Sequence, residues 1–141
     1  MPADNRHAPD NAVRVTDLSA ALLAAEVAQS VNRPLILVSE PEAGIYAGGG
    51  WWRALTDHVA RAHPGLSVTA ILDCGAHVGA ALGAIRAGCS DLTLTQPSRA
   101  MIGFATAWNV TLHERPARVL TLGPLDARTG SVIQRFLLDE R

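Results

Sequence analysis

Short apolar runs typical of buried strands alternate with helical patterns along this chain, and no other feature of the sequence constrains the fold as much. The run Leu35-Ile36-Leu37-Val38 is continuous and apolar, as in a strand buried on both faces. Residues 66–72 (LSVTAIL) are expected to form the next strand, and a helical pattern follows at 80–87. Strand and helix alternate four times, which predicts a parallel sheet with right-handed crossovers. Local pattern leaves open whether that sheet is open or curled as part of a barrel.

The expected elements follow one another over most of the chain. We expect strands at residues 12–15, 35–38, 66–72, 92–95, 109–112 and 118–122. We expect helices at residues 18–30, 51–63, 80–87 and 99–108, and a turn or helix around 132–137. Thr16 or Asp17 can cap the first helix. The Gly-rich stretch 39–50 is expected to form a long loop.

Composition and charge exclude several classes of protein. With 141 residues, 48% of them hydrophobic, the chain is expected to form one domain at 12–141. Residues 1–11 are polar without periodicity, which predicts a disordered leader. A net charge of −1 without a Lys/Arg run argues against nucleic-acid binding.

The sequence also indicates a compartment. No stretch is long and apolar enough to span a bilayer, and the N-terminus carries no apolar signal segment, so we expect no membrane partner and a cytoplasmic location. Cys74 and Cys89 match no zinc-finger or CxxC spacing, and reduced thiols are the expected state.

The segment from Ile71 to Gly79 (ILDCGAHVG) holds the strongest candidate site, because it ends a strand on an acid, a thiol and two glycines. Side chains at the C-terminal ends of parallel strands are placed to meet ligands. The residues expected to surround a ligand at these strand ends are Ser39, Gly48, Asp73, Cys74, Gly75 and His77. Two structural alternatives stay open: Asp73 can cap the next helix, and Cys74 can be a small buried hydrophobe.

Several segments, in order between Asp17 and Ser98, resemble the N-terminal half of class II fructose-bisphosphate aldolases and their ketose-bisphosphate relatives. Residues 34–40 (PLILVSE) resemble the second strand of that family (PVIIQAS), and residues 46–48 resemble the Y-A-G that follows it. Residues 63–68 (HPGLSV) resemble its Y-P-x-I-P-V segment. Residues 72–75 (LDCG) stand where the family has L-D-H-G, and residues 84–92 resemble its A-I-R-x-G-F-x-S-V.

The resemblance implies an α/β fold of parallel βα repeats, an aldolase-like half-barrel derived from a TIM barrel, with about four to five strands. It implies a general acid/base role for Asp73, and it places Cys74 where the family has a zinc-ligating histidine. His77 would raise the number of zinc ligands to two at most, so we expect no cofactor, with zinc as the alternative. A half-barrel leaves two sheet edges, which predicts a homodimer or larger homo-oligomer, or a C-terminal segment from Val119 onward that shields an edge.

Residues 71–79 also resemble motif I of S-adenosylmethionine-dependent methyltransferases, L-D-x-G-x-x-x-G. Residues 96–101 (QPSRAM) resemble the D-P-S-x-x-M that follows their second strand, although Gln96 stands where that family has the acid that binds the ribose.

Three functions therefore stay open. The first is a catalytically vestigial, self-associating half-barrel protein that binds a small phosphorylated or carbonyl ligand at the strand ends. The second is an active aldolase-type lyase with Asp73 as acid/base and Cys74 as metal ligand or nucleophile. The third is a methyltransferase-like protein that binds S-adenosylmethionine.

Overall fold

The structure is a computed structural model that describes residues 11–139, and it contains six strands and six helices in this range. The strands are β1 (Ala12–Arg14), β2 (Leu35–Val38), β3 (Val68–Asp73), β4 (Asp91–Thr93), β5 (Thr111–His113) and β6 (Val119–Thr121). The helices are α1 (Leu18–Ser30), α2 (Ala43–Tyr46), α3 (Gly49–Ala62), α4 (Val78–Arg86), α5 (Arg99–Ala107) and α6 (Thr129–Leu138). None of these helices is both long and apolar enough to cross a membrane.

The sheet is parallel throughout, with the order β5-β4-β3-β2-β1-β6. From β1 to β5, strands that are consecutive in the chain are neighbours in the sheet, which confirms the predicted half-barrel of parallel βα repeats. The sheet has six strands rather than the four to five expected. The additional strand is β6, which pairs with β1 through residues such as Ala12 and Val119 and is itself the edge strand on that side.

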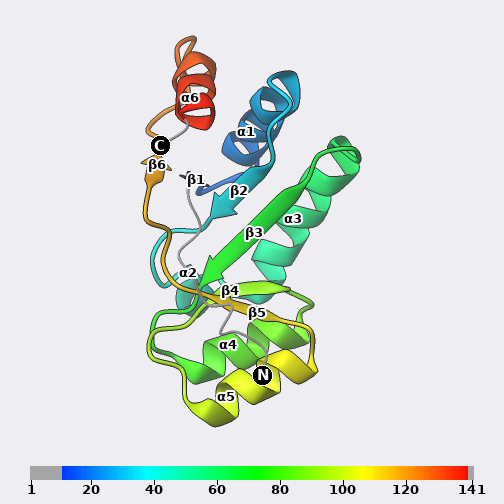
Figure 1. The fold of residues 1–141 in the computed structure, drawn as a ribbon, viewed down its shortest axis with the longest axis vertical. Helices are drawn as coiled ribbons and strands as arrows, with labels where there is room; N and C mark the ends of the chain where they lie inside the picture. The colour runs from blue at the N-terminus through cyan, green and yellow to red at the C-terminus, as the bar shows by residue number, and fades with distance from the viewer. Residues whose placement is uncertain (1–10, 140–141) are drawn as a thin grey trace.

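The helices form one layer along the sheet. In Figure 1 they follow one another from α6 and α1 at the top, through α3, to α4 and α5 at the bottom. All six helices contribute buried residues to a single core cluster with one face of the sheet. The alanines of α1 are its buried residues, and their small side chains let this helix lie close to the strands.

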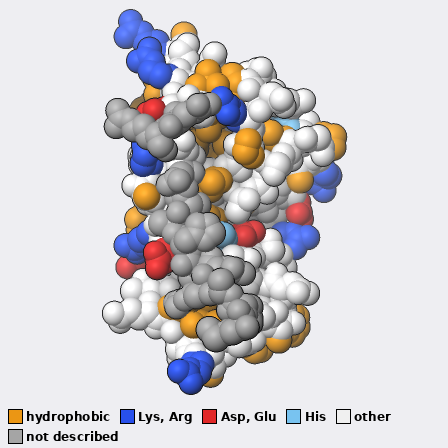
Figure 2. Space-filling view, in the orientation of Figure 1, with side chains coloured by type: hydrophobic (Ala, Val, Ile, Leu, Met, Phe, Trp, Pro, Cys, Tyr) orange, Lys and Arg blue, Asp and Glu red, His pale blue; other side chains and the backbone are white. Residues whose placement is uncertain are grey.

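The opposite face of the sheet, which we call the inner face, carries the alternate residues of each strand, because side chains alternate along a strand. Ala12, Val38 and Ile71 form a small apolar cluster on it, with Ile36 and Val119 packed against them. Towards β4 and β5 the residues of this face are polar. On the side of the molecule shown in Figure 2, the Arg side chains lie in several separate places.

Three expectations from the sequence need correction or qualification. The stretch 39–50 is not all loop, because it contains α2. The strand expected at 109–112 begins two residues later: Asn109 has a φ of 57° and the N–H of Val110 donates to the carbonyl of Ala105, so both residues close α5. The expected leader lies outside the described residues except for Asn11, whose side chain donates to the carbonyl of Asp139.

Candidate ligand-binding site

Asp73 lies at the end of β3, with its side chain only 5% exposed, and its carboxylate accepts three hydrogen bonds. Its Oδ1 accepts from the backbone N–H of Glu42 at 3.1 Å and from that of Gly75 at 2.8 Å. Its Oδ2 accepts from Nε of Arg115 at 3.1 Å. The carboxylate thus ties the loop after β2 and the segment after β5 to the end of β3.

Ser39, the residue after β2, belongs to the same network. Its hydroxyl accepts from the backbone N–H of Asp73 at 3.0 Å and donates to the carbonyl of Glu40 at 3.0 Å. Gly75 has a φ of 57°, which favours glycine, and the turn that it makes directs its N–H to the carboxylate. The structure therefore brings Ser39, Asp73 and Gly75 together, but their polar groups bond to one another and to backbone.

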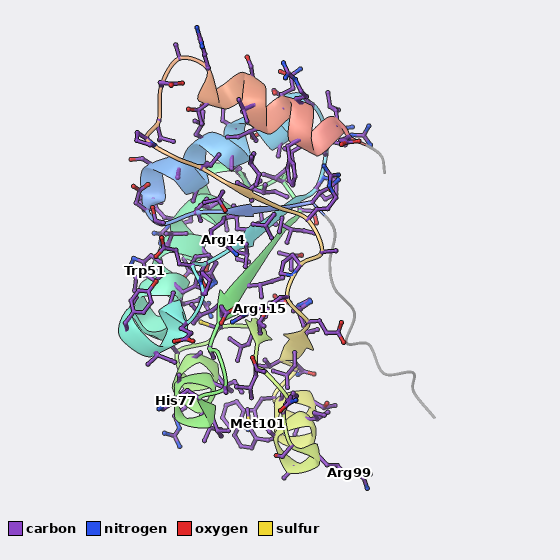
Figure 3. The ribbon with its side chains drawn as sticks, turned by 90° about the vertical axis from the view of Figure 1, so that its left-hand side faces the viewer. Arg14, Trp51, His77, Arg99, Met101 and Arg115 are labelled. Atoms are coloured by element: carbon purple, nitrogen blue, oxygen red, sulfur yellow. The ribbon has the colours of Figure 1, made fainter. Side chains whose placement is uncertain are left out.

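His77 and Gly48 lie at the N-termini of two helices. His77 is the N-cap of α4, and its Nδ1 accepts from the backbone N–H of Ala80 at 2.9 Å. Gly48 is the N-cap of α3, where its φ of 87° suits a residue without a side chain. Figure 3 shows His77 beside α4, well apart from Arg14.

Cys74 points into the helix-side core, away from the inner face, and is fully buried. Burial, with a further contribution from Asp73, raises the pKa of this thiol to about 12. A thiol with such a pKa is protonated at neutral pH and is neither a nucleophile nor a ready metal ligand. Within residues 11–139, no group of three His, Cys, Asp or Glu side chains is placed to hold a metal ion.

A cavity of about 320 Å³ lies at the same edge of the sheet, beyond the ends of β1 and β6. It is lined by Arg14, Thr16, Asp17, Ala20, Leu122, Gly123, Pro124 and Leu125. These residues come from the last residue of β1, the turn after it, the first turn of α1 and the loop after β6. Small-molecule pockets begin at a volume of roughly 300 Å³, so the cavity is large enough for a small ligand.

Arg14 is the cationic group of this cavity. Its Nη1 donates to Oγ1 of Thr121, the residue opposite it on β6, at 3.2 Å. Its Nε is buried and has no hydrogen-bond partner in the described part of the chain. Buried N–H groups are normally paired with protein, water or ligand. This N–H is therefore a donor that no described residue satisfies.

Asp17 provides the acidic group of the cavity. Its Oδ1 accepts from the backbone N–H of Ala20 at 2.8 Å and so caps α1, as the sequence predicted. No hydrogen bond to its second oxygen is seen among residues 11–139. The cavity thus combines a guanidinium donor and a carboxylate acceptor with apolar side chains from the loop after β6.

The position of the cavity agrees with a general rule for parallel sheets. Ligands bind outside the carboxyl ends of the strands, at the point where the strand order reverses. Here β2 to β5 extend from one side of β1, and β6 lies on its other side, so the reversal falls at β1. The loops that line the cavity follow the two strands that meet there.

Sequence reasoning missed Arg14 and Arg115. Apolar and polar residues alternate around Arg14 in β1. This alternation could have predicted that its side chain lies on the face opposite the core. Arg115 lies in a segment expected to be a connection, and its contact with Asp73 spans 42 residues of sequence. Comparison of the chain with protein-family models finds no matching model, and comparison with curated proteins finds no relative.

Proposed function

We propose that this chain is a cytoplasmic ligand-binding protein that takes a small phosphate- or carboxylate-bearing molecule in the cavity between the ends of β1 and β6. The observation that carries the proposal is the unpaired, buried Nε of Arg14 beside a cavity of about 320 Å³. An oxyanion is the natural partner of a guanidinium because it accepts charge-assisted hydrogen bonds.

The other lining residues limit the rest of the ligand. The second oxygen of Asp17 and the hydroxyl of Thr16 suit a hydroxyl group on the ligand. Leu122 and Leu125 suit a short carbon chain. A hydroxylated compound with one anionic end matches this set, and it falls within the class of phosphorylated or carbonyl ligands expected from the sequence.

Binding is favoured over aldolase-type catalysis by the state of Asp73. A general acid/base needs a carboxylate oxygen that can reach a substrate proton. The carboxylate of Asp73 already accepts from Glu42, Gly75 and Arg115. The aldolase-like origin, the methyltransferase alternative and a bound zinc ion stay predictions. Both cysteines lack a disulfide, which supports a reducing compartment.

Self-association is part of the proposal. Within the described residues the two edge strands have one neighbour each: β6 is paired only with β1, and β5 only with β4. An unpaired edge strand can pair with a second copy. Native mass spectrometry at micromolar protein concentration is expected to give a dimer or larger species, and a monomer alone would contradict this part.

The ligand proposal can be tested by calorimetric titration of the full chain with inorganic phosphate and, separately, with glycolate. We expect one of them to bind saturably. Arg14→Met should weaken its affinity about tenfold or more, because a charge-assisted hydrogen bond is lost. Arg61→Met is the matched control, because Arg61 is exposed in the last turn of α3.

The two ligands distinguish the two kinds of anion. Binding of phosphate alone would assign a phosphorylated ligand, and binding of glycolate alone a hydroxy acid. Equal binding to the wild type and to Arg14→Met would contradict the proposal, as would the absence of binding to either anion.

A further inference from the structure

A row of polar residues crosses the inner face at the ends of three strands. Asp73 on β3 is the register partner of Thr93 on β4, and Thr93 is the partner of His113 on β5. Leucines 72, 92 and 112 precede these residues and enter the helix-side core, so the three polar side chains point to the inner face. Neighbouring strands are about 4.8 Å apart, which places the three side chains side by side.

His113 is held in one orientation by Asp91. Its Nε2 lies 2.8 Å from Oδ1 of Asp91, and the two side chains are only 12% and 22% exposed. The hydroxyl of Ser90 donates to the other carboxylate oxygen at 3.0 Å. A carboxylate only accepts hydrogen bonds, so Nε2 carries the proton and Nδ1 of a neutral imidazole is left with its lone pair.

Two polar atoms of this row have no partner. Oγ1 of Thr93 and Nδ1 of His113 are buried, and neither makes a hydrogen bond within residues 11–139. Thr93 as a whole is only 3% exposed. Native proteins pair almost all such groups with protein, water or ligand. A hydroxyl that both donates and accepts, next to a nitrogen that accepts, is the complement of another hydroxyl group.

Arg115 adds donors at the border of the row. Its Nε donates to Asp73, and its side chain is 57% exposed, so solvent reaches the guanidinium. Its terminal N–H groups make no hydrogen bond with the described residues. The carboxylates of Asp73 and Asp91 outnumber this one guanidinium, which disfavours a second anion and favours a neutral ligand.

We propose that His113, Thr93 and Arg115 form a second binding site, on the inner face, for a neutral polyol or small sugar. One hydroxyl of the ligand donates to Nδ1 of His113 and accepts from Thr93, and a neighbouring hydroxyl accepts from Arg115. The site is separate from the cavity at Arg14 and does not depend on the anion proposed there.

The test uses the imidazole nitrogen resonances of His113 in the full chain, assigned with His113→Gln. The probe is meso-erythritol, and 1,4-butanediol, which lacks its two inner hydroxyls, is the control compound. We expect meso-erythritol to shift the Nδ1 resonance saturably. Thr93→Val, which removes only the hydroxyl, should weaken binding about tenfold, the ratio for one lost hydrogen bond.

Two control variants complete the experiment. Thr111→Val, at an exposed position of β5, should bind meso-erythritol like the wild type, and so should Arg14→Met. Arg115→Met gives the same test as Thr93→Val if the latter does not fold. The proposal is overturned if the wild type shows no saturable shift, if 1,4-butanediol gives the same shift, or if the folded Thr93 and Arg115 variants bind like the wild type.

Discussion

Two regions at the same edge of the sheet differ in how their polar groups are used. At the ends of β2 and β3, the carboxylate of Asp73 and the hydroxyl of Ser39 bond to neighbouring groups of the chain. At the ends of β1 and β6, Arg14 keeps an unpaired N–H beside a cavity. The first region has the sequence features of an active site. The second has a hydrogen-bond donor without a partner, as a binding site requires. A network that satisfies itself stabilises the fold, whereas one that does not can hold a ligand.

The largest expected effect is that of Asp73→Ala on stability. The change leaves the N–H groups of Glu42 and Gly75 without their acceptor, and we expect the free energy of unfolding to fall by about 2–4 kcal/mol. The exposed side of the ion pair with Arg115 adds little. Urea denaturation measures the change. Asp57→Ala is the control: it breaks an exposed ion pair with Arg53 and should lower the free energy of unfolding by less than about 1 kcal/mol. A loss as small as that of the control would mean that Asp73 is free for chemistry after all.

The next effect concerns the thiol beside this network. The pKa of Cys74, raised by burial from 9.0 to about 12, leaves far less thiolate than usual at pH 8. We expect alkylation of the folded protein by iodoacetamide to be slower than in urea by about a hundredfold or more. Because the folded pKa is the higher one, the thiol stabilises the fold below pH 9, and this contribution is lost as the pH rises towards 12. Mass spectrometry of Cys74→Ala isolates the reaction of Cys89, and rapid alkylation of Cys74 at pH 8 would restore the nucleophile hypothesis.

A third change tests how closely α2 packs on the end of β3. A Cβ at Gly44 would lie 2.7 Å from Sγ of Cys74 and 3.0 Å from the carbonyl oxygen of Asp73. We expect Gly44→Ala to lower the free energy of unfolding by about 1–3 kcal/mol, because a backbone oxygen cannot move aside cheaply. Gly83→Ala is the matched control: a Cβ there meets nothing within 4 Å, and in the middle of α4 it should stabilise by up to about 1 kcal/mol. Equal effects of the two changes would mean that the contact at Gly44 is loose.

The sequence predicted most of the fold because its signals are local. The range of α1 was predicted correctly, and Asp17 is one of the two caps that the sequence offered for it. The range of β5 was wrong because Val110 is apolar but completes the end of α5. The site was harder to predict because it depends on contacts between distant residues. Arg14 meets Thr121 across 107 residues of sequence, and no local pattern indicates that β6 returns to β1.

The smallest expected effect is that of Arg14→Met on the stability of the ligand-free protein. The change removes one exposed hydrogen bond, to Thr121, and also removes the unpaired buried N–H. These contributions oppose each other, so we expect the free energy of unfolding to change by less than about 1 kcal/mol. Thr121→Val is the companion variant, since it takes away the acceptor and leaves the guanidinium in place. If Arg14→Met destabilises the fold as much as Asp73→Ala, then Arg14 holds β1 and β6 together as Asp73 holds the ends of β2 and β3, and the contrast between the two regions disappears. If the loss is small while anion binding is lost, Arg14 is present for a ligand, because the fold does not need it.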